Sequence, residues 1–307
     1  MDTINKVKLK DFSNQYYKSV DEFVNSDFEH NKVLGKFYTN ISIAEDLVDD
    51  IITVFSEDNI KELNIIDPFC GDGRLIKLLI LKMNELDNYK GCRYNVTLWD
   101  IDSKAVEIAK NTLDCIAMDL KIEISVKAEI ADAFVLYASE INNYDICITN
   151  PPWGLLKPQK IFSDRFGSKE IEKYKDSIAL YDEYMKHEFC LSQPTRRFGR
   201  WGTNLGRCGV EVALRLINKN GLCGLVSPAS LFNDRVSVPF REWIFEQHKI
   251  YTISYFPAEL KLYGTADVSS ITTLIGNGCT NSTFKIRIYD LEQRFVEQRL
   301  KIGRAHV

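Results

Sequence analysis

The chain has 307 residues, of which 45% are hydrophobic and 27% charged, an ordinary globular composition that excludes a disordered or collagen-like chain. This length predicts one large α/β domain or two smaller ones. The formal net charge is −4, from 39 basic and 43 acidic residues. Nucleic-acid-binding domains are often basic overall, so this balance weakly disfavours that class without excluding it, because a local basic patch is sufficient.

No segment approaches the roughly 18 consecutive apolar residues that a membrane-spanning helix needs. The N-terminus lacks the apolar core of a secretion signal. We therefore expect a cytosolic protein with no membrane association. The eight cysteines include no Cys-x-x-Cys pair, and most lie in apolar segments such as residues 146–148. They are predicted to be reduced core thiols, and neither a metal site nor a disulfide framework is expected.

Strand-like and helix-like patterns alternate along the chain. A helical pattern in the N-terminal residues 1–32 is followed by another over residues 41–52, and helices are predicted at residues 75–81 and 105–113. The predicted strands are residues 63–66, 96–99, 122–126, 145–149, 222–226, 250–255 and 270–275. This alternation predicts a Rossmann-like α/β fold: a doubly wound, mainly parallel seven-stranded sheet with helices on both faces.

The C-terminal residues 291–307 are predicted to be a tail outside the α/β domain, which we assign to residues 33–290. Residues 302–307 match the translation of a widely used sequencing adapter in one reading frame. We interpret them as adapter read-through, which predicts that the natural protein continues past about residue 301. The alternative is an ordinary frayed C-terminus.

Ligands of a doubly wound sheet bind beyond the carboxyl ends of its strands. After the first strand comes Asp-Pro-Phe-Cys-Gly-Asp-Gly, residues 67–73, whose glycines suit a sharp turn or a close approach by a ligand. The following helix N-terminus favours an anionic group, although a plain strand-to-helix turn remains the alternative. No Lys-Ser or Lys-Thr follows, which excludes the phosphate-binding P-loop, and Ile76 at the third glycine position disfavours an oxidoreductase dinucleotide site.

Two further acids follow the next strands. Asp100 can accept hydrogen bonds from two ribose hydroxyls; its alternative role, capping the next helix, suits Asp102 or Ser103 better. Asp132 can accept a hydrogen bond from an adenine amino group, with Phe134 as an apolar wall. A role of Asp132 as a loop cap is equally open.

Asn150-Pro151-Pro152-Trp153 ends the fourth strand. The two prolines restrict the backbone, so that the Pro151 carbonyl and the Asn150 side-chain oxygen can accept the two N–H bonds of one amino group. Trp153 offers a flat face for stacking a planar base or peptide group. A chance rigid turn is the alternative.

At this point the sequence resembles the S-adenosylmethionine-dependent DNA adenine-N6 methyltransferases, whose fourth-strand motif reads [DNS]-P-P-[YFW]. The upstream segment Gly35-Lys36-Phe37-Tyr38-Thr39-Asn40 is similar to their Gly-x-Phe-Tyr-Thr-Pro motif, with Asn40 in place of proline. The resemblance implies a class I methyltransferase fold for residues 33–290. It implies catalysis by residues 150–153 and stacking of the target base on Trp153 and Tyr263. It also implies that the cofactor is held by Phe37, Tyr38, Thr39, Asp67, Phe69, Gly71, Gly73, Asp100, Ile101, Asp132 and Ala133.

The order of the motifs resembles the methylase parts of type I, type IIG and phage-defence modification enzymes. This implies DNA as substrate and partner, in a restriction-modification or phage-defence system, with a C-terminal target-recognition domain or separate specificity and nuclease subunits missing from this sequence. An acid-free segment carries four arginines interleaved with Phe198 and Trp201, which predicts a loop that contacts DNA phosphates. These are Arg196, Arg197, Arg200 and Arg207; a solvated basic loop is the alternative.

Three other readings of the same motifs remain open. Asn-Pro-Pro-aromatic motifs also occur in enzymes that methylate glutamine side chains or guanine N2 of ribosomal RNA. Methylation of cytosine N4 usually accompanies serine in place of Asn150. In a third reading, the chain is an inactive fragment that binds cofactor or DNA without its target-recognition half.

Overall fold

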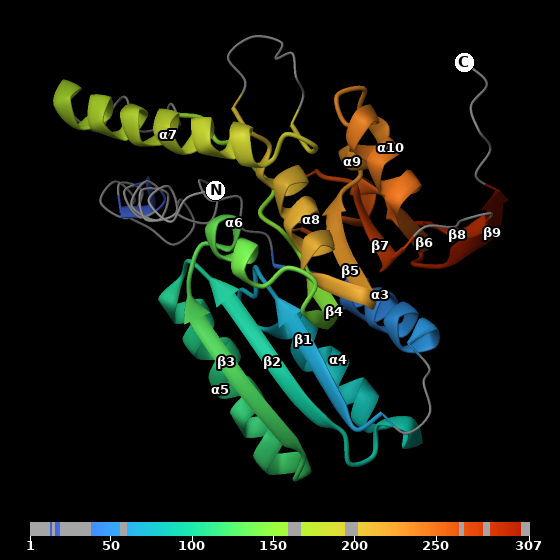
Figure 1. The fold of residues 1–307 in the computed structure, drawn as a ribbon. Coiled ribbons are helices and arrows are strands. Elements are labelled where there is room, and N and C mark those ends of the chain that lie inside the picture. Colours follow the sequence, from blue (N-terminus) through green and yellow to red (C-terminus); the bar gives the residue numbers. More distant parts are fainter. Residues whose placement is uncertain are drawn as a thin grey trace.

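The computed structural model describes residues 13, 16–18, 38–55, 60–158, 167–193, 202–263, 267–278 and 283–301. Its centre is a nine-stranded sheet in the order β3-β2-β1-β4-β5-β7-β6-β8-β9 (Figure 1). The strands are β1 (Glu62–Asp67), β2 (Arg93–Asp100), β3 (Glu123–Ile130), β4 (Tyr144–Thr149), β5 (Ile217–Pro228), β6 (His248–Phe256), β7 (Ser270–Asn277), β8 (Thr283–Tyr289) and β9 (Phe295–Lys301).

Strands β1 to β5 are mutually parallel, and β7 is antiparallel to both of its neighbours, β5 and β6. The central strands are apolar on both faces, as a sheet covered by helices on both sides requires. In β4, for example, Ile146 and Ile148 pack into one core cluster and Cys147 into the other. The predicted mainly parallel, doubly wound sheet is therefore confirmed.

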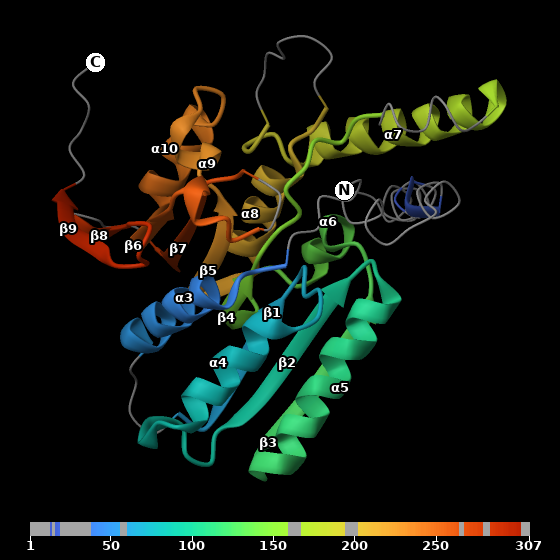
Figure 2. The same ribbon diagram turned by 180° about the vertical axis from the view of Figure 1, so that it is seen from behind.

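Helices cover both faces of the sheet. The helices are α3 (Ile41–Val54), α4 (Arg74–Asn84), α5 (Ser103–Leu120), α6 (Ala133–Leu136), α7 (Ser168–Glu188), α8 (Leu205–Leu216), α9 (Ser230–Asn233) and α10 (Val238–Gln247), with short 3₁₀ helices at Asp87–Tyr89, Tyr137–Ser139 and Ala258–Leu260. Apolar residues of α3, α4 and α5 share one core cluster on one face of the sheet (Figure 2). Residues of α6, α7, α8 and α10 share the cluster on the other face.

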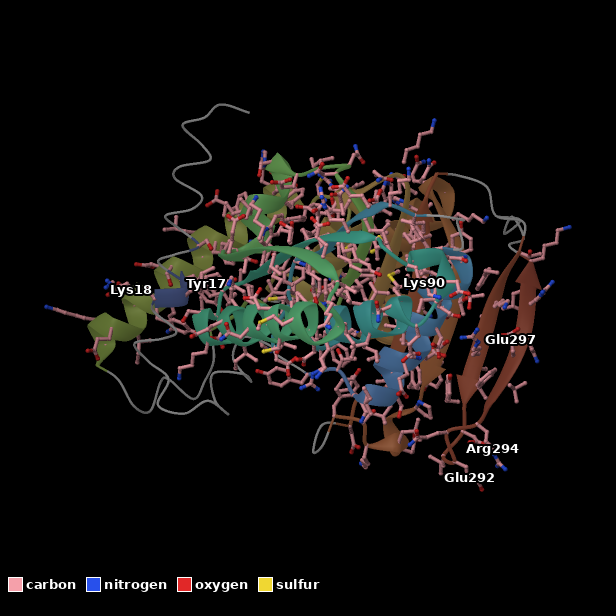
Figure 3. The ribbon with its side chains drawn as sticks, turned by 90° about the horizontal axis from the view of Figure 1, so that it is seen from below. Tyr17, Lys18, Lys90, Glu292, Arg294 and Glu297 are labelled. Carbon is pink, nitrogen blue, oxygen red and sulfur yellow. The ribbon has the colours of Figure 1, made fainter. Side chains whose placement is uncertain are left out.

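The prediction of seven strands was too low, because β8 and β9 extend the sheet beyond β6. They form an antiparallel hairpin whose turn contains the predicted domain boundary at residue 290. Figure 3 shows Glu292 and Arg294 at this turn and Glu297 on β9. The alternation in Thr-Phe-Lys-Ile-Arg-Ile-Tyr, residues 283–289, is a strand signal that the sequence analysis did not use.

A charged cluster ties this hairpin to α3. The Arg287 guanidinium on β8 lies 3.1 Å from the Asp46 carboxylate and 2.8 Å from that of Asp50, both on α3. Arg287 also pairs with Glu297 at 2.9 Å. Burial, followed by repulsion from Asp46, raises the pKa of Asp50 to about 6. The pairing compensates two carboxylates that would otherwise be buried and unpaired.

Of the predicted N-terminal helical segment, the structure describes residue 13 and residues 16–18, which are helical; the other residues before 38 lie outside the described part. The Tyr16 ring stacks on Tyr181 of α7, with centroids 5.5 Å apart. Figure 3 shows Tyr17 and Lys18 at the end of the molecule away from Glu297. In the described part of the chain, no helix is long and apolar enough to cross a membrane.

Candidate active site

A cleft of about 770 Å³ lies at the carboxyl ends of the parallel strands. It brings together residues from the β1–α4 loop, the end of β2, the β3–α6 junction and the segment after β4, as the doubly wound topology requires. The predicted site residues that line it are Tyr38, Phe69, Gly71, Asp100, Ile101, Asp132, Ala133, Asn150 and Pro152. Tyr16, Tyr17, Pro68, Ala105, Ala131, Phe134 and Leu205 complete the lining.

Asp67 is not among the lining residues, and its side chain is 1% exposed. Its Oδ1 atom accepts a 2.6 Å hydrogen bond from the Thr149 hydroxyl and a 3.1 Å bond from the Phe69 amide. Burial raises the pKa of Asp67 to about 7. Asp67 thus joins the ends of β1 and β4 and shapes the loop that reaches the cleft.

Glycine occupies positions 71 and 73 of this loop for two different structural reasons. Both have positive φ, 49° at Gly71 and 77° at Gly73. A Cβ atom at Gly73 would lie 2.8 Å from the Cβ atom of Ala109, so glycine here permits α5 to pack against the loop. A Cβ atom at Gly71 would meet only the Tyr38 ring, at 3.7 Å, and would project into the cleft. Gly71 therefore keeps space for a ligand.

Asp100 holds the same loop from the neighbouring strand. Its Oδ2 atom accepts a 2.9 Å hydrogen bond from the Gly71 amide and its Oδ1 atom a 3.0 Å bond from the Asp102 amide. Asp102 caps α5 by accepting from the amides of Lys104 and Ala105, as one of the two predicted caps. The Asp100 carboxylate also lines the cleft, and a carboxylate oxygen can accept more than one hydrogen bond.

Asp132 is the N-cap of α6, where its Oδ1 atom accepts a 2.9 Å hydrogen bond from the Phe134 amide. Its Oδ2 atom accepts 2.5 Å bonds from the hydroxyls of Ser13 and Tyr181. Burial raises the pKa of Asp132. The capping role is thus confirmed, and a contact with an adenine amino group stays a prediction. Tyr16 and Tyr17 of the cleft and Tyr181, which bonds to Asp132, were not predicted, because no local motif links them to this region.

The segment before α3 meets the Asn-Pro-Pro-Trp motif. Asn150 Nδ2 donates a 3.0 Å hydrogen bond to the hydroxyl of Thr39, whose side chain is buried. Arg74 secures this segment, since its guanidinium donates to the Thr39 carbonyl at 2.8 Å and lies 4.9 Å from the centroid of the Tyr38 ring. Asn40 caps α3 by accepting from the Ser42 amide, which gives asparagine a local function at the position of the family proline. Phe37 lies outside the described residues.

The N-terminal half of α8 packs directly on the motif. A Cβ atom at Gly209 would lie 2.4 Å from Pro151 Cβ, and one at Gly206 would lie 3.6 Å from the Pro152 carbonyl oxygen. Gly209 therefore permits the close approach of α8 to Pro151, whereas the distance at Gly206 is that of an ordinary contact. The Leu205 amide also donates to the Gly154 carbonyl at 2.9 Å.

Trp153 and Tyr263 lie together although they are far apart in sequence. Their rings are 4.7 Å apart between centroids and inclined by 63°, an edge-to-face contact that leaves no space for a base between them. A second cavity, of about 940 Å³, lies beside Trp153 and is lined by residues of α8, the end of β5 and the α9–α10 region. A planar group can therefore reach Trp153 from this cavity.

The predicted arginine loop needs one correction. Arg196, Arg197 and Arg200 lie outside the described residues. Arg207, however, lies in the first turn of α8 because Asn204 caps this helix by accepting from the Arg207 amide at 3.0 Å. Its side chain is 8% exposed, bonds to the Ser237 hydroxyl at 3.2 Å and lies 4.0 Å from the Asp234 carboxylate. Arg207 is thus a buried helix residue of the second cavity and not part of an open loop.

The chain is 29% identical over 179 residues to the type II methyltransferase M.VspI of Vibrio sp. strain 343, an alignment that covers 58% of this chain and 38% of that protein. Its fold is similar to a solved putative class I S-adenosylmethionine-dependent methyltransferase from Listeria monocytogenes, with a TM-score of 0.54 and 16% identity over 79% of this chain and 61% of that one. It is also similar to the methyltransferase subunit of a type I restriction-modification system from Streptococcus thermophilus, with a TM-score of 0.53 and 16% identity over 82% and 47% of the two chains.

These relatives are longer than the parts that match, and the chain spans about two fifths of the length of M.VspI. The model of the N-6 DNA methylase family matches residues 12–190, more than half of the chain. The chain therefore belongs to the N-6 DNA methylase family.

Proposed function

We propose that this chain transfers a methyl group from S-adenosylmethionine to the N6 amino group of adenine in DNA. The observation that carries the proposal is that Asn150 and Pro152 line the same cleft as Gly71, Asp100 and Asp132. An amino-group acceptor and the acids at two strand ends thus line one cleft. Membership of the N-6 DNA methylase family supports adenine as the target.

The residues of the cleft fit the proposed cofactor. The Asp100 carboxylate can accept from ribose hydroxyls, the cleft has apolar walls such as Phe69, Ile101 and Phe134, and Gly71 leaves space where a Cβ atom would project. When bound, S-adenosylmethionine supplies an electrophilic methyl group on a sulfonium centre. The helix N-terminus behind residues 67–73 faces the same region and suits the carboxylate of the methionine part.

Asn150 and the Pro151 carbonyl act on the target amino group. The lone pair of an adenine amino nitrogen is delocalised into the ring, which makes the nitrogen a poor nucleophile. Two acceptors that take its N–H bonds localise the lone pair toward the methyl donor. Positioning of the amino group supplies much of the rate, and no strong general base is needed before the transfer, since the proton can leave afterwards.

The base must leave the DNA duplex to reach this position, at a cost of a few kcal/mol. Stacking on Trp153, with Tyr263 in edge contact, offsets this by about 1–3 kcal/mol for each effective aromatic contact. The cavity beside Trp153 provides the space for the extruded nucleotide.

We also propose that this chain works together with further domains or subunits. Because the matched relatives are longer, we propose that a target-recognition domain, or separate specificity and nuclease subunits, work with this methylase part in restriction-modification or phage defence. Arg196, Arg197 and Arg200 are proposed to contact DNA phosphates, so that binding weakens steeply with salt. A DNA substrate is consistent with the cytosolic location predicted from the sequence.

The test uses unmethylated DNA and S-adenosylmethionine labelled in its methyl group, with nucleosides separated by mass spectrometry. N6-methyladenine that disappears in Asn150→Ala, while cofactor affinity by calorimetry persists, supports the proposal. Label on cytosine N4, on guanine N2 or on a glutamine side chain would retain the cofactor assignment and refute the adenine assignment. Cofactor binding with no transfer to any substrate would favour the fragment that binds without catalysis.

A further inference from the structure

The cavity beside Trp153 has a polar wall that the proposed transfer does not use. This wall comes from three elements: Arg207 on α8, Ser227 at the end of β5 and Ser237 just before α10. All three side chains are at least nine-tenths buried, with 8%, 2% and 1% exposure. Three buried polar side chains on the wall of a roomy cavity are costly unless they are satisfied.

Ser227 supplies the clearest sign of a missing ligand. Its hydroxyl is buried and has no hydrogen-bond partner among the described residues. Burial of a hydroxyl without a partner destabilises a folded protein, and an apolar side chain of similar size would remove that cost. Since Ser227 lines the cavity, its hydroxyl can be satisfied by a group that enters from there.

Arg207 is oriented for the same space. Its guanidinium bonds to the Ser237 hydroxyl at 3.2 Å and lies 4.0 Å from Asp234. Arg241, whose guanidinium also lies 4.0 Å from Asp234, secures that region by donating to the Asp234 carbonyl at 2.7 Å. A guanidinium carries five N–H donors in a fixed plane, which suits Arg207 to donating to a planar ligand in the cavity that it lines.

We infer that Arg207 and Ser227 recognise the ring of the extruded base by donating hydrogen bonds to its acceptor nitrogens. This inference rests on the proposed function, since it assumes that Asn150 and Pro151 hold the amino group. Apart from that group, the polar atoms of adenine are the acceptors N1, N3 and N7, which match a wall of donors. Guanine carries an N1–H donor beside its O6 atom, and a guanidinium that faces this donor would reject it.

The position of α8 supports this assignment. Gly209 allows the helix to pack onto Pro151, so Arg207 is held on the same rigid element that contacts the reactive motif. A base stacked on Trp153 would therefore meet the motif along one edge and the Arg207 wall along another. Arg207 and Ser227 are specificity-determining residues in this arrangement.

The experiment measures binding of labelled DNA duplexes by fluorescence anisotropy, with the full chain saturated with the cofactor analogue sinefungin. Each duplex carries one test base opposite an abasic site, which lowers the cost of extrusion. The test bases are adenine, 1-deazaadenine, 3-deazaadenine, 7-deazaadenine and guanine, and a duplex with no base at that position is the reference.

For the wild-type chain, adenine should bind more tightly than the reference, and guanine and at least one deaza analogue should bind on the order of tenfold to a hundredfold more weakly than adenine. Arg207→Met or Ser227→Ala should lose a similar factor for adenine and no longer distinguish the affected analogue. Ser227→Ala should also melt at the same or a higher temperature, because it removes a buried hydroxyl without a partner. Arg93→Met, which removes an exposed arginine paired with Glu123 on β3, is the matched control and should behave like the wild type.

The inference is overturned if both variants retain the full wild-type preference among the test bases, or if adenine binds no better than the reference. N6-methyladenine formation, measured on the same preparations, separates the two proposals. Transfer to adenine with unchanged discrimination in both variants refutes only the role of Arg207 and Ser227. Transfer to a different acceptor refutes the proposed function itself.

Discussion

Asn150 donates through its Nδ2 atom to the hydroxyl of Thr39 at 3.0 Å. In this arrangement the amide nitrogen of Asn150 faces Thr39 and the side-chain oxygen points away from Thr39. Thr39 comes from the segment before α3 and Asn150 from the end of β4, so two motifs far apart in sequence meet in one hydrogen bond.

Asn150→Ala should abolish most methyl transfer and leave the affinity for S-adenosylmethionine nearly unchanged. Loss of a preorganised acceptor is expected to remove about 3 kcal/mol of transition-state stabilisation, by analogy with deletion of an oxyanion-hole donor. Asn150→Asp should lose less, because a carboxylate still accepts. Single-turnover rates and calorimetry check this; full activity in Asn150→Ala would show that residues 150–152 are only a rigid turn.

Thr39→Val should reduce the transfer rate by roughly fivefold, since the amide loses the bond that orients it, which is worth about 1 kcal/mol. Thr39→Ser retains the hydroxyl and should restore the rate. Because Thr39 is buried, the melting temperatures of both variants should be measured beside the rates. Equal rates in the valine and serine variants would contradict an orienting role.

Asp132 offers a way to separate capping from ligand binding. Asp132→Ala should lower the free energy of unfolding by about 1 kcal/mol through loss of the α6 cap, whereas Asp132→Asn retains a good cap. If the Asp132 carboxylate contacts the cofactor, both variants should bind S-adenosylmethionine more weakly. Unchanged affinity in Asp132→Asn would leave Asp132 with a capping role alone. Chemical denaturation and calorimetry on the same samples give the two quantities.

Asp67 should make the folded protein more stable at low pH than at high pH. An acid in a salt bridge has the opposite effect, because its pKa is lowered on folding. Its pKa in the folded protein, about 7, lies above the ordinary value of 3.8, so the folded state binds the extra proton between these values. The contribution of Asp67 is therefore complete below about pH 4 and is lost as the pH rises through 7. Melting curves across this range should show the trend relative to Asp67→Asn, in which it should be absent. A difference between the two proteins that is independent of pH would contradict the raised pKa.

Much of the catalytic half could be predicted from the sequence, because its signals are local. Asp67-to-Gly73, Asp100, Asp132 and Asn150-to-Trp153 each lie at or just after the end of a strand, and parallel strands bring their carboxyl ends to one edge of the sheet. The apolar patterns therefore predicted the strands and the position of the cleft, whereas the order of the strands in the sheet comes from the structure. The hairpin β8–β9 had a comparable alternating signal that was not used.

Only the tertiary structure decided which side chains meet. The contact of Thr39 with Asn150 and the bonds of Ser13 and Tyr181 to Asp132 join residues more than 45 positions apart, and no local pattern encodes such pairs. For Gly73, the sequence context suggested contact with a ligand. The structure shows instead that glycine at this position permits the close packing of Ala109. Arg207 was predicted to lie in a loop because it belongs to a basic segment. The Asn204 cap and the burial beside Ser237 show that it lies in α8 and lines the second cavity. Burial depends on what the rest of the chain packs against a residue, and that is a property of the folded molecule as a whole.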